Sequence, residues 1–268
     1  MSVKIPDLKE MFLTGMHFGH KKERSHPRSK DYVFGLRDGV NVIDLGKTQD
    51  MLKSVLEFIT REVSQGKVFL FVGTKKQIKD VVKEAAEKCD MPYATHRWLG
   101  GTLTNFETIK NGIRSLESTE AKLADPDADM TKKEKTLLDK DLQKLKETYQ
   151  GIRNMKKLPD VMFIVDVVKE GSAVSEAKKK QIPVVGVCDT DADPRLVDWV
   201  IPANDDAKNS VDMIMKLVVE AVQEGKSANR RSADSGNNTK KSVVKEEQVL
   251  SELDSVEEIK EEDDKEEK

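Results

Sequence analysis

The sequence predicts an α/β protein built on a Rossmann-like parallel sheet flanked by helices. Three short aliphatic runs bounded by turn or charged residues are typical of strands covered on both faces, at residues 67–73, 160–166 and 182–189. Weaker strand candidates lie at residues 40–45 and 199–202. Helical stretches alternate with these strands, at residues 48–64, 75–89, 169–180 and 206–224. That alternation indicates a parallel sheet with helices on both faces.

One segment, residues 105–151, interrupts the alternation and has no strand pattern. Phe106, Ile109, Ile113 and Leu116 are spaced by 3, 4 and 3 residues. After an Asp-Pro turn, a second stripe is spaced by 4, 3, 4 and 3 residues and consists of Leu138, Leu142, Leu145, Tyr149 and Ile152. These spacings predict an antiparallel coiled-coil helical hairpin inserted into the globular domain. The alternative is a broad amphipathic pair lying on the core, and the narrow stripe favours a protruding arm.

Charge is distributed unevenly along the 268 residues. Residues 242–268 hold 12 acidic residues and 4 lysines, a net charge of −8, whereas the remaining 241 residues hold 42 basic and 37 acidic residues, a net charge of +5. We therefore predict a mildly basic globular domain at 1–104 and 152–226, with a basic segment at 1–30. Residues 227–268 are predicted to be a disordered tail, acidic from 242, because it holds too few apolar residues to offset its ordering entropy.

The composition also excludes several classes of protein. Cys89 and Cys188 are far apart without CxxC spacing, so neither a disulfide framework nor a cysteine zinc site is indicated. No apolar run approaches the roughly 20 residues of a membrane helix, and the first residues do not resemble a signal peptide. A cytoplasmic protein with no membrane partner is expected.

A nucleotide site is the first function to consider, because parallel sheets often carry one. The loop after the clearest strand, Gly73-Thr-Lys-Lys-Gln77, is a plausible anion site at a helix N-terminus. However, neither GxxxxGK[ST] nor GxGxxG occurs, and an RNA phosphate could use the same geometry. No cofactor is predicted.

Aspartates gather in two loops that follow predicted strands. Asp189, Asp191, Asp193 and Asp205 are weak candidates for metal ligands, since the spacing resembles a calcium loop without its glycine and terminal glutamate. Helix capping by Asn204 or Asp206, and a turn or helix start at Asp193-Pro194, explain the loops better.

Basic residues are mixed with imidazoles near the N-terminus, where three of the four histidines occur. This mixture suits phosphate contact and base stacking better than a zinc site, although a solvated basic face is the alternative. The RNA-binding candidates over the whole chain are His17, His20, Lys21, Lys22, Arg24, Arg28, Lys30, Arg37, Lys75, Lys76, Arg97, Lys110 and Arg114.

A set of short strings in a fixed order makes the chain recognisable. They begin with Met16-His-Phe-Gly-His20, Tyr32-Val-Phe-Gly-Leu-Arg37 and Val42-Ile-Asp-Leu-Gly-Lys-Thr48. Phe71-Val-Gly-Thr-Lys-Lys-Gln77 and Arg97-Trp-Leu-Gly-Gly-Thr-Leu-Thr-Asn-Phe106 follow. The last are Leu158-Pro-Asp160, Ile182-Pro-Val-Val185, Asp189-Thr-Asp-Ala-Asp-Pro194 and Ile201-Pro-Ala-Asn-Asp-Asp206. From about Met11 to Lys226 the chain closely resembles the bacterial form of the universal ribosomal protein S-two family.

The resemblance implies a non-enzymatic, structural constituent of the small ribosomal subunit. Its partners would be small-subunit ribosomal RNA and neighbouring ribosomal proteins, including ribosomal protein one. The chain departs from the family pattern at Ser25-His-Pro-Arg28, where Trp-Asn-Pro-Lys is usual, and at Asp191 and Ala203, which replace Asn and Gly. The acidic tail is not a general family feature. A nucleotide-dependent enzyme on the same kind of sheet is the alternative function.

Overall fold

The computed structural model describes residues 3–125 and 130–231. Its centre is a five-stranded parallel sheet in the order β5-β4-β6-β7-β8. The strands are β4 (Phe69–Val72), β5 (Tyr93–Ala94), β6 (Val161–Val165), β7 (Val184–Cys188) and β8 (Trp199–Pro202). Counted along the chain, this is the doubly wound order 2-1-3-4-5, whose direction reverses between β4 and β6. The predicted α/β class and parallel sheet are confirmed.

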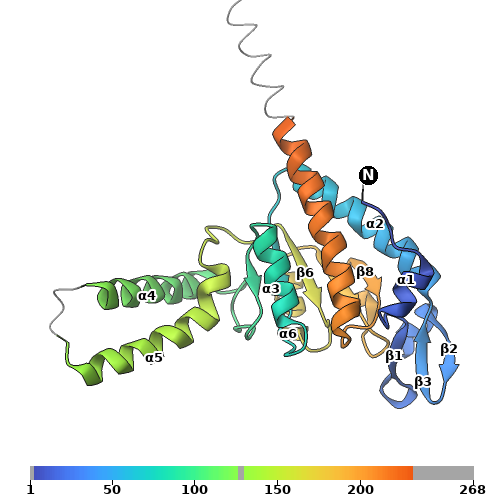
Figure 1. Ribbon diagram of the computed structural model, residues 1–268, viewed down its shortest axis with the longest axis horizontal. Helices are drawn as coiled ribbons and strands as arrows, with labels where there is room; N and C mark the ends of the chain where they lie inside the picture. The colour runs from blue at the N-terminus through green and yellow to red at the C-terminus, as the bar shows by residue number, and fades with distance from the viewer. Residues whose placement is uncertain (1–2, 126–129, 232–268) are drawn as a thin grey trace, which may run out of the picture.

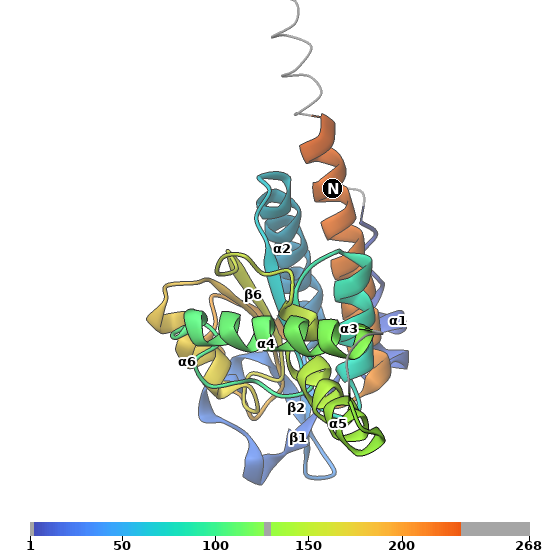
Figure 2. The same cartoon turned by 90° about the vertical axis from the view of Figure 1, so that its left-hand side faces the viewer.

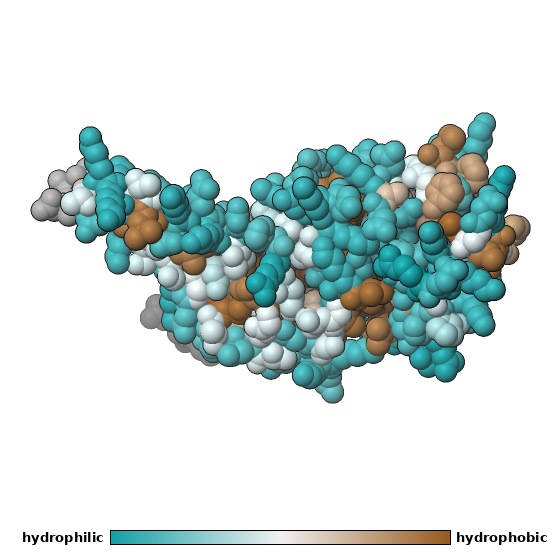
Figure 3. Space-filling model, turned by 90° about the horizontal axis from the view of Figure 1, so that it is seen from below, coloured by the Kyte–Doolittle hydropathy of each residue, from teal (hydrophilic) through white to brown (hydrophobic). Residues whose placement is uncertain are grey.

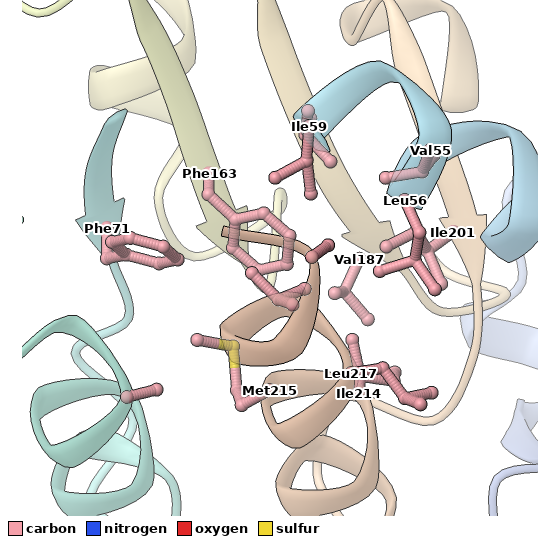
Figure 4. Close-up of a cluster of buried hydrophobic side chains, with 14 of the residues drawn as sticks. Val55, Leu56, Ile59, Phe71, Phe163, Val187, Ile201, Ile214, Met215 and Leu217 are labelled. Atoms are coloured by element: carbon pink, nitrogen blue, oxygen red, sulfur yellow. The ribbon is translucent and has the colours of Figure 1, made fainter. Parts of the chain in front are cut away.

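Helices cover both faces of the sheet (Figure 1). One face packs against α2 (Leu45–Ser64), α3 (Lys79–Lys88) and a last helix over residues 208–231. The other packs against α6 (Gly171–Lys179) and the base of the hairpin. Successive strand residues serve opposite layers, since Phe69 and Phe71 enter one core and Leu70 and Val72 the other. Figure 4 shows Phe71 pointing toward Phe163, which lies between Ile59 of α2 and Met215 of the last helix.

The N-terminal 44 residues add a small antiparallel sheet that the sequence patterns did not reveal. After α1 (Leu8–Leu13) come β1 (Phe18–Lys21), β2 (Val33–Arg37) and β3 (Val40–Ile43), in the order β1-β3-β2. Two short 3₁₀ helices, η1 (Lys22–Arg24) and η2 (Pro27–Tyr32), connect β1 to β2. The predicted strand at 40–45 is therefore real, but it belongs to this second sheet.

The inserted segment forms two helices, α4 (Phe106–Ala124) and α5 (Lys132–Tyr149), followed by η3 (Gln150–Ile152). They project together from the domain (Figures 1 and 2). The arm is not independent of the domain at its base, where Ile109 and Ile113 join the core layer that contains Leu70. Farther out, Glu120 of α4 lies 3.2 Å from Lys146 of α5 and 2.8 Å from Arg153, which follows η3. The hairpin is present, and coiled-coil packing of its helices stays a prediction.

Two predicted helix bounds change for tertiary reasons. The helix predicted at 75–89 begins at Lys79, because Lys75 turns inward and residues 76–78 form a turn. The last helix runs to residue 231, five residues into the segment that was predicted to be disordered. Gly225 packs directly against α2, and Lys226 donates a 2.6 Å hydrogen bond to the Cys89 carbonyl, which holds this end in place. The acidic part of the predicted tail, residues 242–268, lies outside the described residues.

One buried carboxylate fixes the loop that leads into the arm. Glu176 of α6 accepts hydrogen bonds from the Trp98 indole at 3.1 Å and from the backbone amides of Gly101, Leu103 and Thr104 at 2.8–3.0 Å. Burial alone would raise the pKa of Glu176, but these donors outweigh burial and lower it. The loop at 98–104 is thereby clamped onto α6, which sets the direction in which α4 leaves the domain.

Candidate ribonucleoprotein surface at the carboxyl edge of the sheet

The carboxyl ends of the parallel strands meet at the edge where doubly wound folds bind their ligands. Three buried aspartates follow three of these strands directly: Asp166 after β6, Asp189 after β7, and Asp205 shortly after β8. The loop after β4 brings Lys75 to the same edge, and β1 brings His20 from the small sheet. The crevice of this fold is thus occupied by the chain's own charged side chains.

Lys75 is the centre of the first half of this cluster. Its amino group lies 2.8 Å from Asp166, 2.6 Å from Asp205 and 2.8 Å from Asp206. Burial would lower the pKa of Lys75, but the three carboxylates, Asp205 foremost, raise it well above its ordinary value. Burial and the Asp166 charge raise the pKa of Asp205, and Lys75 opposes that rise. An ammonium ion held by three carboxylates has no donor left for an RNA phosphate, so Lys75 is internal and structural.

His20 occupies the second half of the cluster. Its Nδ1 lies 3.1 Å from Asp189, and its Nε2 lies 3.4 Å from Asp206 and 3.7 Å from Asp191. The Nδ1–Asp189 contact is the shortest of the three and pairs the imidazole with a buried carboxylate. The Asp189 carboxylate raises the pKa of His20 to about 8 against the opposing effect of burial. The imidazole is therefore mostly charged at neutral pH and faces the aspartates, which removes it from any RNA surface.

Three of the residues in this half of the cluster lie close enough together to hold a cation. Ligand atoms of His20, Asp189 and Asp191 lie within 4.8 Å of one another. Of the four aspartates predicted as weak candidates for metal ligands, Asp189 and Asp191 therefore lie close together, and the other two lie apart from them. Asp193 caps the 3₁₀ helix η4 (Pro194–Leu196) and pairs with Arg195 at 2.8 Å, whereas Asp205 binds Lys75. Asn204 accepts hydrogen bonds from the Asp206 and Ala207 amides in the turn just before the last helix, and the capping interpretation is correct for Asp193.

Thr190 joins the N-terminal segment to this edge. Its Oγ1 accepts a 2.8 Å hydrogen bond from the His20 amide, and its carbonyl accepts bonds from the His26 amide at 2.8 Å and the Ser29 hydroxyl at 2.6 Å. Gly19 is required for this contact, since a Cβ there would lie 2.6 Å from the Thr190 methyl. His26 also accepts a bond from the Arg28 amide at 3.2 Å and so caps η2. Residues 18–30 are consequently held rigidly against the sheet.

The remaining RNA-binding candidates divide into three groups. The first group is exposed on β1, η1 and η2 and consists of Lys21, Lys22, Arg24, Arg28 and Lys30. Lys76 and Arg97 are exposed in the loops after β4 and β5, at the same edge, and Arg37 is exposed at the end of β2. Lys110 and Arg114 lie on the arm, where Lys110 pairs with Glu107 at 2.9 Å. His17 is buried and stacks on Phe12 at 4.1 Å between ring centroids, so it does not face solvent.

Sequence reasoning missed Asp166, Thr190 and Glu176, all of them buried polar residues. A signal for Asp166 was present, because an aspartate directly after each of two adjacent parallel strands must lie at one edge. Thr190 and Glu176 had no such signal, since their partners are backbone groups far along the chain.

Comparison with known proteins identifies the family to which this fold belongs. The family described as Ribosomal protein S2 matches residues 11–225. The chain belongs to the ribosomal protein S2 family. The small ribosomal subunit protein uS2 of Campylobacter curvus is 45% identical over 260 residues, which cover 96% of this chain and 98% of the relative. The proteins of the same name from Geotalea uraniireducens and Helicobacter hepaticus are 46% and 44% identical and cover 81% and 83% of this chain, and 86% and 85% of their own lengths.

The ion cluster contains residues of the motif strings by which the chain resembles this family. Four of the nine motif strings that carried the resemblance lie at this edge: the first holds His20, the fourth Lys75, and the last two Asp189 to Asp206. Cys89 and Cys188 are both free and buried. No helix among the described residues is long and apolar enough to span a membrane.

Proposed function

We propose that this protein binds small-subunit ribosomal RNA with the exposed basic residues of the carboxyl edge. As a member of the ribosomal protein S2 family, it is a structural constituent of the small ribosomal subunit and is located on ribosomes in the cytoplasm. The observation that carries the RNA surface is the anchoring of residues 18–30 by Thr190. Five cations on a rigid support lose little conformational entropy when they meet phosphates, and phosphate contacts position a protein on RNA.

The internal cluster supports a structural, non-catalytic role. Within residues 3–125 and 130–231, the crevice at the strand ends is occupied by Lys75 and His20 with their aspartates, and the loop at 73–77 directs Lys75 inward rather than toward a ligand. The enzyme alternative therefore has no support in the arrangement of this edge.

The test of the RNA surface is the salt dependence of affinity for small-subunit ribosomal RNA. Changing Lys21, Lys22, Arg24 and Arg28 together to Ala should reduce the slope of log affinity against log salt by about 3, at just under one ion per phosphate contact. A matched control removes the same charge elsewhere, by changing Lys53, Lys88, Lys179 and Lys180, all exposed, to Ala. Equal slopes for the two quadruple variants would mean that the RNA surface lies elsewhere.

We further propose that neighbouring proteins, ribosomal protein one among them, dock on an apolar surface beside this edge. Figure 3 shows apolar atoms gathered at the end of the molecule opposite the arm, where α1, β1 and β2 lie. Exposed large side chains of these elements are Leu8, Phe12, Leu13, Phe18, Phe34 and Leu36, with Phe34 79% exposed. Apolar surface of this kind marks protein interfaces.

Changing Phe18 and Phe34 to Ser should lower the amount of ribosomal protein one that sediments with small subunits while this protein still incorporates. Leu137→Ser, on the exposed face of α5, is the control. Undiminished sedimentation of ribosomal protein one in the double variant would contradict this docking site.

A further inference from the structure

A groove lies at the amino edge of the parallel sheet, at the other end of the strands from the ion cluster. It consists of two adjoining hollows that share Val68, Asp90 and Met91. The larger, of about 620 Å³, lies between the end of α3 and the segment that follows α5. The smaller, of about 280 Å³, lies between the start of β4 and the last helix. In Figure 1 this is the upper side, where the last helix ends.

The groove has a lining of mixed apolar and polar residues and a basic rim. Its apolar lining residues are Val63, Val68, Met91, Pro92, Tyr93, Met155 and Leu158. The charged residues that line it are five cations, Lys67, Lys156, Lys157, Lys226 and Arg230, and two carboxylates, Glu87 and Asp90. Lys156 and Arg230 are exposed. A ligand for this groove should therefore combine aliphatic groups with negative charge.

The chain itself supplies such a segment beyond residue 231. Val249, Leu253, Val256 and Ile259 are spaced by 4, 3 and 3 residues, which is the spacing of one helix face. Glu252, Asp254, Glu257 and Glu258 are interleaved with them. We propose that residues 249–259 dock in the amino-edge groove of the same molecule, with the aliphatic side chains on its lining and the carboxylates against its lysine rim. An amphipathic segment in an apolar groove is a common mode of recognition.

The connection between groove and segment makes this docking feasible. Arg230, which lines the groove, is one residue from the end of the described chain. Seventeen residues, 232–248, separate this end from the proposed segment, and a flexible chain of that length has an r.m.s. span of roughly 20–25 Å. A tether of this kind gives an effective concentration on the order of millimolar, so a contact that is weak between separate molecules suffices.

The observations favour this segment over RNA as the occupant. The apolar lining residues contribute little to phosphate binding, whereas they can cover the aliphatic side chains of the segment. A docked segment would neutralise the basic rim and leave the carboxyl edge open. Before assembly, the protein would then keep its ribosomal RNA surface at the carboxyl edge, and the basic rim of the groove would no longer bind RNA non-specifically.

The experiment uses the full chain with a nitroxide spin label at position 251, introduced as Ser251→Cys. Cys89 and Cys188 are buried, and burial raises the pKa of Cys89 to about 11, so the label should react at the new cysteine alone. The methyl resonances of Met91 and Met155, which line the groove, should lose most of their intensity. Met16, which lies near the other edge beside Asn204, should keep its intensity.

Two variants make the result specific. Leu253→Asp with Val256→Asp in the labelled chain should restore the Met91 and Met155 signals, and so should Lys156→Glu with Lys157→Glu. Lys53→Glu with Lys179→Glu is the control with the same charge change on other surfaces, and it should leave the signal loss unchanged. All of the substituted lysines are exposed, and unchanged methyl resonances of Met16 in each variant check that the fold is retained.

Equal intensity of Met91, Met155 and Met16 in the labelled chain would overturn the proposal. Two results together would identify RNA as the occupant. In a chain that ends at Lys241, Lys156→Glu with Lys157→Glu would weaken binding of ribosomal RNA. In the full chain, the label at position 251 would leave Met91 and Met155 unaffected. Neither outcome depends on the salt experiment at the carboxyl edge, so the two proposals fail separately.

Discussion

Lys75 and Asp205, separated by 130 residues, form a 2.6 Å ion pair at the carboxyl edge of the sheet. The pair joins the loop after β4 to the loop after β8, two strands that are not neighbours in the sheet. Asp166 supplies a second carboxylate from β6, which lies between them. One ammonium group therefore connects three of the five strands.

Removing this ammonium should destabilise the fold strongly. Lys75→Met leaves buried carboxylates without a counter-charge, and breaking such a pair costs about 3–5 kcal/mol. The exposed neighbour provides the control, since Lys76→Met should change the free energy of unfolding by less than about 0.5 kcal/mol. Urea unfolding of the two variants measures both values. Similar midpoints for the two variants would show that the cluster is not structural.

Protonation of His20 should make stability depend on pH above neutrality. Its pKa is raised to about 8 in the folded protein, chiefly by Asp189, so its contribution is complete below the unfolded value of 6.5 and is lost as pH rises through 8. Because the His20 imidazole is only partly shielded from solvent, we expect the free energy of unfolding to fall by about 1 kcal/mol between pH 6.5 and 8.5. In urea unfolding at each pH, His20→Gln should lose less stability than the wild type over this interval, and the remaining loss comes from Asp205, whose pKa is also raised by burial. The exposed His96→Gln should retain the full loss, and a wild-type profile that matches His20→Gln would contradict the assignment.

The contact between Gly19 and Thr190 should tolerate no side chain. In Gly19→Ala the new methyl would lie 2.6–2.8 Å from the Thr190 side chain and 3.1 Å from the Asn41 carbonyl, so β1 must shift. Such overpacking costs about 1–3 kcal/mol. Gly35→Ala in β2 is the matched control, because its Cβ would meet nothing within 4 Å. Hydrogen exchange of the His20 and His26 amides should accelerate in the first variant alone, and equal protection in both would disprove the close contact.

The arm should be divisible into a dispensable outer part and an essential base. Replacing residues 118–144 with a short Gly-rich turn leaves Ile109 and Ile113 in the core and should change the free energy of unfolding of the domain by less than about 1 kcal/mol. Deleting residues 107–150 removes those side chains from the core and should cost several kcal/mol. Thermal unfolding distinguishes the two deletions. If the shorter deletion were as damaging as the longer one, the outer helices would be supporting the domain.

The sequence by itself determined the buried strands of the parallel sheet, most helices and the arm, because each of these leaves a local pattern, whereas β1, β2 and β5 were not predicted. The buried runs that became β4, β6 and β7 are apolar on both faces, and α4 shows its stripe at Ile109, Ile113 and Leu116. The extension of the last helix to residue 231 was not predictable, because Gly225 and Lys226 gain their packing and hydrogen-bond partners from α2 and the end of α3.

Tertiary structure alone decided which charged residues face inward. Lys75 and Lys76 are adjacent and chemically identical, yet one is held by three carboxylates and the other is exposed. His20 likewise resembles a basic-surface residue until β1 places it against Asp189 and Asp191. Composition and periodicity describe local stretches of the chain, so they predict helices and strands but not contacts between distant residues. An ion cluster depends on the side chains that parallel strands bring together at one edge, and these can be far apart in the sequence, as Lys75 and Asp205 are, at 130 residues.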